Sequence, residues 1–222
     1  MPSLLIASTD TEVGKTVCTV ALATYYQAHY PHKKLGMMKP IQCGVGDKET
    51  YTQLLSLDQS ATELNPIYFE APVAPPIAAA GQPIDLGKVW QQLQNLQQRC
   101  DLVLIEALGG LGTPMTRELT VADVAREWRL PTVLVVPVRL GSIGQAVANV
   151  ALAKQANVNL KGIILNCQRP TSAADLENLT PADLIMNLTR VPVIGCLPYL
   201  PDWPAPQNLA QAAQDLEWSL LW

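Results

Sequence analysis

The segment from residue 8 to residue 16 restricts most strongly what this 222-residue chain can fold into. It reads STDTEVGKT and lies between a short apolar run at residues 4–7 and a longer one at residues 17–23. This order predicts a strand, a tight loop and a buried helix. A helix N-terminus presents free backbone N–H groups and a partial positive charge to an anion. The segment, called the phosphate loop below, is therefore predicted to bind phosphate.

Three residues of the phosphate loop suit this chemistry. Gly14 lets the backbone approach a phosphate, Lys15 can neutralise the β- and γ-phosphates, and the hydroxyl of Thr16 can reach a magnesium ion. The strict motif has a glycine five residues before Gly14, where this chain has Thr9, so the loop is a variant. The alternative is that Gly14, Lys15 and Thr16 merely open a helix. Because a strand precedes and a helix follows, we predict nucleotide binding.

The composition fits a single domain over residues 1–222. Hydrophobic residues make up 49% of the chain and charged residues 15%, which is enough for a large core. A net charge of −4 without any basic run argues against a nucleic-acid partner. No apolar run reaches the roughly 18 residues of a membrane span, and Asp10 and Glu12 interrupt the first one too early for a signal peptide. Five cysteines without metal-site spacing indicate reduced thiols and a cytoplasmic protein.

Apolar runs and amphipathic segments alternate along the chain, which predicts a doubly wound, mostly parallel α/β sheet in a three-layer, P-loop NTPase-like sandwich. The strands predicted after the first are residues 35–38, 101–105, 132–136, 161–165 and 193–197, and the later helices begin near Asp47 and cover 85–99, 145–155, 181–189 and 208–220. Residues 65–82 contain four prolines, so we expect an irregular loop over the sheet edge and no helix there.

Polar residues follow several of these strands, at the edge where open α/β sheets bind ligands. Lys39 ends the second strand, and Pro40 keeps it extended. Asn166 ends a later strand, where its amide could read a purine edge through one donor and one acceptor.

Glu106 is expected at the tip of the strand over 101–105. A buried carboxylate is costly without a cation, and in a phosphate-loop protein the natural cation is magnesium shared with Thr16. The alternative is an acidic residue that caps a turn. The following Gly109 and Gly110 let backbone N–H groups converge on a further anion.

These motifs together resemble the dethiobiotin synthetase family over nearly the whole chain. The most specific ones are residues 9–16, Lys39-Pro40 with Gly44, Glu106 with Gly109-Gly110, and Leu140-Gly141. The resemblance implies a homodimer that uses ATP, magnesium and carbon dioxide to close the ureido ring of dethiobiotin on 7,8-diaminopelargonic acid. One amine would capture carbon dioxide as a carbamate, the γ-phosphoryl group would activate it as a carbamic-phosphoric anhydride, and the second amine would displace phosphate.

The resemblance also implies a role for individual residues. Lys39 and Lys15 would be catalytic, and Thr16, Asp47 and Glu106 would bind magnesium, although Asp47 could simply cap the helix that begins there. The expected ATP-binding residues are Glu12, Val13, Gly14, Lys15, Thr16, Val17, Asp47, Glu106, Gly109, Asn166, Cys167, Pro198, Tyr199, Leu200 and Gln207. The expected substrate-binding residues are Thr11, Lys39, Cys43, Gly110, Gly141 and Ser142, the last two at a helix start that would receive the substrate carboxylate near the dimer interface.

The chain departs from the family pattern at three positions. Ser8 replaces a glycine, Cys43 stands where a small hydroxyl residue often contacts substrate, and Gln207 stands where an acid near the ribose is expected.

Three other functions compete with this interpretation. A partitioning-type nucleotide-switch ATPase would carry a lysine where this chain has Asp10, and a corrin-pathway amidoligase would need a glutaminase domain. A non-catalytic nucleotide-binding module would leave Lys39 and Glu106 without a role.

Overall fold

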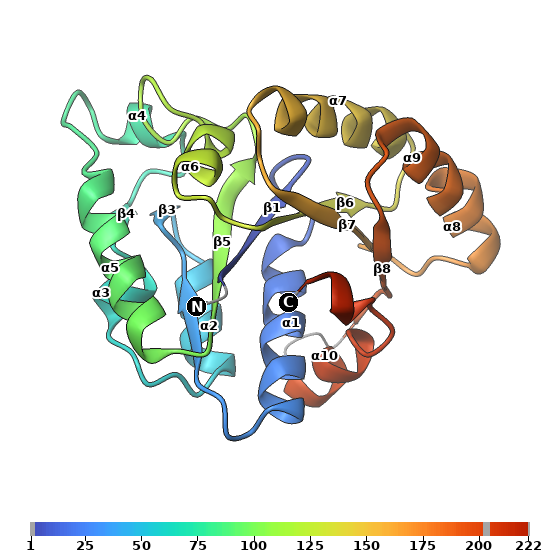
Figure 1. Ribbon diagram of the computed structural model, residues 1–222, viewed down its shortest axis with the longest axis horizontal. Helices are drawn as coiled ribbons and strands as arrows, with labels where there is room; N and C mark the ends of the chain where they lie inside the picture. The colour runs from blue at the N-terminus through green and yellow to red at the C-terminus, as the bar shows by residue number, and fades with distance from the viewer. Residues whose placement is uncertain (1–2, 202–204, 222) are drawn as a thin grey trace.

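A six-stranded parallel sheet forms the centre of the computed structural model, which describes residues 3–201 and 205–221 (Figure 1). Its strands lie in the order β2-β5-β1-β6-β7-β8, and every neighbouring pair is parallel. Their bounds are β1 Ser3–Ser8, β2 Leu35–Met38, β5 Leu102–Gly110, β6 Thr132–Pro137, β7 Leu160–Asn166 and β8 Val193–Leu197. The predicted α/β fold with a parallel sheet is confirmed.

Helices cover both faces of the sheet, which gives three layers (Figure 1). Helices α1 and α10 pack on one face, and α5, α6, α7 and α9 pack on the other. The helix bounds are α1 Lys15–His29, α2 Asp47–Leu54, α3 Ala61–Leu64, α4 Pro75–Ala78, α5 Leu86–Arg99, α6 Val121–Glu127, α7 Ser142–Gln155, α8 Ala173–Leu179, α9 Ala182–Thr189 and α10 Pro206–Ala212, with a 3-10 turn at Trp218–Leu220. None of these helices has the length and apolar character needed to cross a bilayer.

The central strands are apolar throughout because both of their faces are covered. In β1, Leu5 and Ala7 join the apolar layer under α5, α6 and α7, whereas Leu4 and Ile6 join the layer under α1 and α10. Side chains alternate along a strand, so burial of both faces needs a continuous apolar run and not an alternating pattern. This is why the strands were readable from the sequence.

The position of β1 sets the position of the phosphate loop. Strand β1 pairs with β5 on one side and with β6 on the other. After β1 the chain crosses through α1 to β2, the outermost strand beyond β5, and it later returns to β6 on the other side of β1. The reversal leaves a crevice at the carboxyl ends of the strands, which is where doubly wound sheets bind ligands.

The proline-rich segment at residues 65–82 differs from the expectation. It contains β4 (Ile67–Phe69), which pairs in parallel with β3 (Ile41–Cys43) in a separate two-stranded sheet. It also contains α4, so the prediction of no helix was wrong. Proline is tolerated in the first helical turn because the N–H it lacks has no partner there, and α4 begins at Pro75.

Two further boundaries were also placed wrongly. Strand β5 does not end before Glu106 but continues to Gly110, because β1 pairs with it as far as Ser8 opposite Gly110. The tail predicted as one helix over 208–220 is interrupted after Ala212. The backbone N–H of Glu217 bonds the carbonyl oxygen of Ile194 at 2.9 Å, so the tail turns back onto β8.

Other helix starts also shifted. Helix α7 begins at Ser142, three residues before the start predicted from the apolar pattern and at the helix start that the family resemblance implied. Helix α2 takes Gly46 as its N-cap and Asp47 as its first residue, so the side chain of Asp47 does not cap the helix. Helices α6 and α8 were not predicted.

Candidate active site

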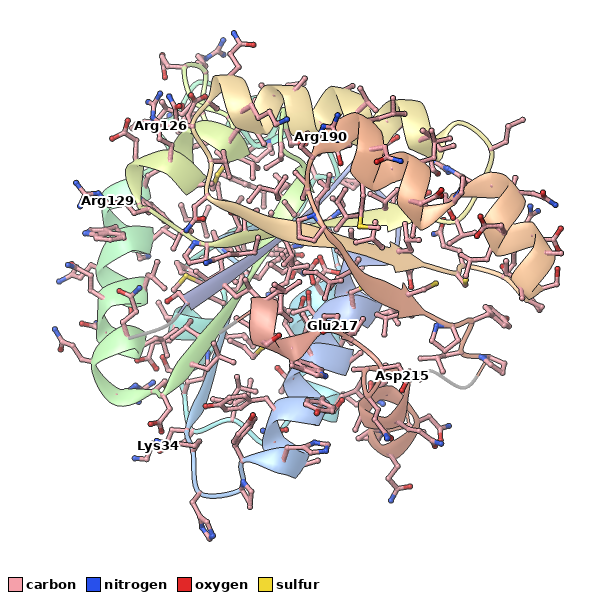
Figure 2. All side chains as sticks on the ribbon, turned by 45° about the vertical axis from the view of Figure 1, so that its right-hand side comes forward. Lys34, Arg126, Arg129, Arg190, Asp215 and Glu217 are labelled. Atoms are coloured by element: carbon pink, nitrogen blue, oxygen red, sulfur yellow. The ribbon has the colours of Figure 1, made fainter. Side chains whose placement is uncertain are left out.

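Buried charge is concentrated at one place in the fold. Across residues 3–201 and 205–221, the buried charged side chains are Lys15, Lys39 and Glu106. The charged residues labelled in Figure 2, such as Lys34 and Arg126, lie instead on the outside of the molecule. Burying a charged group costs free energy unless the group is paired. The three buried groups therefore mark a site where the fold must supply partners.

The phosphate loop bends at two residues in the left-handed region. Glu12 has φ 55° and Gly14 has φ 87°, and Gly14 is the N-cap of α1. No side chain caps this helix end, so its first N–H groups are available to an anion. Val13, between the two, is fully buried and holds the loop against the core.

Two side chains at the end of β7 hold the apex of the loop. The Nδ2 of Asn166 donates to the carbonyl oxygen of Val13 at 2.9 Å, and the Nε2 of Gln168 donates to the carbonyl oxygen of Glu12. A Cβ atom on Gly14 would collide with the amide of Asn166. The amide that was expected to read a purine edge therefore also braces the loop, and the contribution of Gln168 was missed.

Lys15 folds back onto its own loop. Its Nζ donates to the Oγ of Ser8 at 2.9 Å and to the carbonyl oxygen of Asp10 at 3.2 Å. The hydroxyl of Ser8, which is fully buried, lies 2.6 Å from the Asp10 carbonyl oxygen and 3.0 Å from that of Gly109. Burial lowers the pKa of Lys15, and the nearby charge of Glu106 opposes this shift. Ser8, where the family pattern has glycine, thus gives the loop lysine a partner.

Lys39 joins two carboxylates from different elements. Its Nζ lies 2.7 Å from Asp47 Oδ2, at the start of α2, and 2.7 Å from Glu106 Oε1, in β5. The hydroxyl of Thr16 lies 2.8 Å from Asp47 Oδ1 and 3.2 Å from Glu106 Oε1. The fold thus brings together Thr16, Lys39 and Glu106, which were expected at one sheet edge, and Asp47, which the family resemblance implied as a magnesium ligand. We call Thr16, Lys39, Asp47 and Glu106 the ion cluster.

The charges of the ion cluster sustain one another. Burial by itself would lower the pKa of Lys39, but the attraction of Glu106 and Asp47 outweighs burial and raises it. Burial would likewise raise the pKa of Asp47, but the charge of Lys39 and its hydrogen bond hold that pKa below the ordinary value. Lys39 therefore stays an ammonium group, paired with Asp47 and Glu106.

A tyrosine that the sequence analysis missed completes this cluster. Tyr51 is fully buried on α2, and its hydroxyl donates to Glu106 Oε2. Burial, followed by the charge of Glu106, raises the pKa of Tyr51 well above its ordinary value, so the hydroxyl keeps its proton. The only signal in the sequence was its spacing of four residues from Asp47, which places both on one face of a helix.

The residues of the ion cluster fit a magnesium ion. Thr16, Asp47 and Glu106 offer oxygen atoms, which are the donors that Mg²⁺ prefers. The ammonium of Lys39 contacts both carboxylates, which shows that the oxygens surround a place for positive charge. Among the described residues no three His, Cys, Asp or Glu side chains gather around one point. Further ligands would therefore come from phosphate oxygens and water, as is usual for Mg²⁺.

A cavity of about 500 Å³ adjoins the phosphate loop on the side of α7. Gly110 borders it, and a Cβ atom there would lie 3.0 Å from the carbonyl oxygen of Ser8. The residues that line the cavity are Thr9, Asp10, Gly110, Gly112, Thr113, Pro114, Ala148, Asn149 and Leu152. The cavity could hold a small molecule, or an anion in addition to a bound phosphate, beside the phosphate loop.

The remaining predicted site residues lie around this centre. Gly141 is the N-cap of α7 with φ 91°, and the buried hydroxyl of Ser142 has no hydrogen-bond partner among the described residues. Val17 follows Thr16 in α1, Thr11 is exposed on the loop, Cys43 is half-buried in β3, and Cys167 follows Asn166 with its Sγ 3.6 Å from that of Cys196. Pro198, Tyr199 and Leu200 follow β8, and Gln207 is exposed on α10; within the described part of the chain no hydrogen bond joins them to the phosphate loop.

The chain is similar to known proteins over nearly its full length. A family model described as "AAA domain" matches residues 2–207. The "ATP-dependent dethiobiotin synthetase BioD" of Gloeothece citriformis is 57% identical, covering 98% of this chain and 97% of that protein. The protein of the same name from Crocosphaera subtropica is 52% identical, covering all of both chains.

Solved structures with a similar fold are more distant in sequence. A MinC:MinD cell division protein complex from Aquifex aeolicus matches with a TM-score of 0.61 and 17% identity, covering 96% of this chain and 95% of that one. A ParA family ATPase from Chlorobium tepidum matches with a TM-score of 0.61 and 14% identity, covering 99% and 96%. At this identity the likeness shows the fold alone.

We predict that Gly14→Ala abolishes measurable ATP binding, because the new methyl group both strains a residue at φ 87° and displaces the amide of Asn166. The matched control is Gly81→Ala, which has nearly the same φ of 88° but open space around the new atom. It should cost about 1 kcal/mol of stability and leave ATP binding intact. Calorimetric titration of ATP into both variants checks this, and equal affinities would contradict it.

Proposed function

The chain belongs to the family of ATP-dependent dethiobiotin synthetases, and on that premise we propose which of its residues carry out the reaction. Its activity is that of a ligase in biotin synthesis which consumes ATP. The observation that carries the proposed assignment of residues is the ion cluster, in which Lys39 bridges Asp47 and Glu106 beside the phosphate loop. We propose that residues 1–222 act as one domain in the cytoplasm.

The proposed substrates are 7,8-diaminopelargonic acid, carbon dioxide or bicarbonate, and ATP. One amine adds to carbon dioxide and loses a proton, which gives a carbamate. A carbamate oxygen attacks the γ-phosphorus and ADP leaves, which gives the mixed anhydride. The second amine attacks the carbamoyl carbon and loses a proton, phosphate leaves, and the ureido ring of dethiobiotin closes.

Lys15 and Lys39 have separate proposed tasks. Lys15 exchanges its contacts with Ser8 and the Asp10 carbonyl for oxygens of the β- and γ-phosphates. Lys39 lies between the carbamate and the γ-phosphate, where an ammonium stabilises charge that spreads during phosphoryl transfer. A magnesium ion held by Thr16, Asp47 and Glu106 neutralises phosphate charge when bound. In this structure the ammonium of Lys39 lies between two of these oxygen ligands, the carboxylates of Asp47 and Glu106.

The other expected contacts remain proposals. For ATP they are the loop from Glu12 to Val17, Gly109, Asn166, Cys167, Pro198, Tyr199, Leu200 and Gln207. For the diamine they are Thr11, Cys43, Gly110, Gly141 and Ser142. Two observations support parts of this set: Gly110 lines the cavity beside the phosphate loop, and the buried hydroxyl of Ser142, at the start of α7, has no hydrogen-bond partner among the described residues. The bond from Asn166 to Val13 uses one N–H of the amide, which leaves its second N–H and its oxygen for the base.

We propose that the protein is a homodimer with α7 near its interface. Leu140, directly before the N-cap of α7, is 88% exposed, and an apolar side chain this exposed gains stability when a partner covers it. Light scattering after size-exclusion chromatography should give the mass of two chains. Leu140→Glu should shift the mass toward one chain, whereas Ile77→Glu, at a site 69% exposed on α4, should not. A wild-type mass of one chain would contradict the proposal.

The reaction itself is tested by mass spectrometry. Purified protein with the diamine, bicarbonate, ATP and magnesium should form dethiobiotin together with one ADP and one phosphate per product. Chelation of magnesium by EDTA should stop the reaction. Phosphate release without dethiobiotin would instead support a nucleotide-switch ATPase. The fold is compatible with that function, but Asp10 stands where such an ATPase would carry a lysine and argues against it.

The two lysines can be separated by their effects on turnover and on ATP affinity. Lys39→Ala should lower turnover by about 10²–10³-fold with little change in ATP affinity, because its contact strengthens in the transition state. Lys15→Ala should weaken both, and Lys34→Ala, at an exposed lysine, should change neither. Lys39→Arg should restore little, since a planar guanidinium cannot replace a compact ammonium. Calorimetry and single-turnover phosphate release measure the two quantities; wild-type release by Lys39→Ala would refute its catalytic role.

A further inference from the structure

Tyr51 has a contact that its place in the core does not require. Its ring belongs to the apolar layer between the sheet and α1, where any large apolar side chain could fill the space. Its hydroxyl, however, is directed at Glu106 and donates to Oε2 of that carboxylate. A phenylalanine would fill the same volume without this bond. The hydroxyl therefore needs an explanation beyond packing.

The two oxygens of the Glu106 carboxylate have different hydrogen-bond partners. Oε1 accepts from Lys39 at 2.7 Å and lies 3.2 Å from the hydroxyl of Thr16, whereas Oε2 accepts from Tyr51. A planar carboxylate with a donor at each oxygen cannot rotate without breaking a bond. Because Glu106 is only 1% exposed, water cannot readily replace the lost donor. Tyr51 thus fixes the orientation in which the carboxylate of Glu106 faces Lys39 and Thr16.

Helix α2 delivers both this hydroxyl and the second carboxylate. Asp47 and Tyr51 are four residues apart and lie on one face of the helix. Asp47 contacts Lys39 and Thr16 directly, and Tyr51 reaches the same two residues through Glu106. The start of α2 is in turn attached to β3, because the Oε1 of the buried Gln42 accepts from the N–H of Lys48 at 2.9 Å. One anchored helix therefore aligns both acidic groups.

We propose that Tyr51 is a positioning residue for the reaction, whose hydroxyl orients Glu106 toward Lys39 and Thr16. The inference rests on the proposed roles of those three residues. It also explains why an ionisable carboxylate can be held in one orientation in the middle of a buried strand.

The first test is Tyr51→Phe, which removes the hydroxyl and keeps the ring. We expect kcat for dethiobiotin formation to fall about 10–100-fold, as is typical when an outer partner of an active-site ligand is lost. The KM for ATP should change by less than about threefold, because Lys15 and the backbone of the phosphate loop are untouched. The matched control is Tyr26→Phe, which also removes a hydroxyl from a tyrosine of this apolar layer. Tyr26 lies on α1, ten residues and therefore about 15 Å along the helix axis from Thr16. This variant should keep wild-type kcat.

The second test needs no activity and asks whether Tyr51 acts through Glu106. Urea unfolding is measured without ligands for the wild type, Tyr51→Phe, Glu106→Leu, which has no acceptor for the hydroxyl, and the double variant. If the hydroxyl serves Glu106, the effect of Tyr51→Phe on unfolding free energy will be smaller in the Glu106→Leu background than in the wild type.

Each outcome decides the proposal. Wild-type kcat in Tyr51→Phe, or equal effects on unfolding in the two backgrounds, would overturn it and leave Tyr51 as a packing residue. A wild-type protein that forms no dethiobiotin would instead refute the proposed function, while the unfolding cycle would still report whether Tyr51 and Glu106 are coupled.

Discussion

The bonds from the ammonium of Lys39 to Asp47 and Glu106 are the interaction on which the site depends. They join the end of β2, the start of α2 and the middle of β5, and the hydroxyl of Thr16 connects the same group to α1. Lys39 and Glu106 are buried and Asp47 is partly buried, and burying charged groups is costly unless they are paired. Loss of one would leave the others unpaired, so the cluster also constrains how these four elements can pack.

The ammonium groups of Lys15, in the phosphate loop, and Lys39, in the ion cluster, each have their own partners within the protein in the absence of a ligand. Lys15 is satisfied by Ser8 and a loop carbonyl, and Lys39 by the two carboxylates. ATP would then exchange existing contacts for phosphate contacts, and no new charge would have to be created in the interior. Groups that are already oriented and charged need little reorganisation during reaction, which is the main way in which enzymes stabilise phosphoryl transfer.

The fold by itself does not decide the function. The MinD and ParA structures share this architecture at low sequence identity, whereas the curated synthetases share the sequence. One fold can carry unrelated activities, which depend on the side chains of the site built on it. In this chain the residues to which we assign that choice are Asp10 in the loop and Lys39, Asp47 and Glu106 beside it.

The sequence alone determined the main strands, the phosphate loop and its helix, and the meeting of Lys39, Glu106 and Thr16 at one edge. Continuous apolar runs identify strands buried on both faces, and parallel strands bring their carboxyl ends together. Only the tertiary structure decided the β3–β4 sheet, because a strand of three residues is too short to show a periodic pattern. It also decided that β5 continues past Glu106, because pairing with β1 extends that strand. It also decided the partners of single side chains. Tyr51 and Glu106 are 55 residues apart, and Asn166 and Val13 are 153 apart, so their bonds arise from packing and from no local pattern.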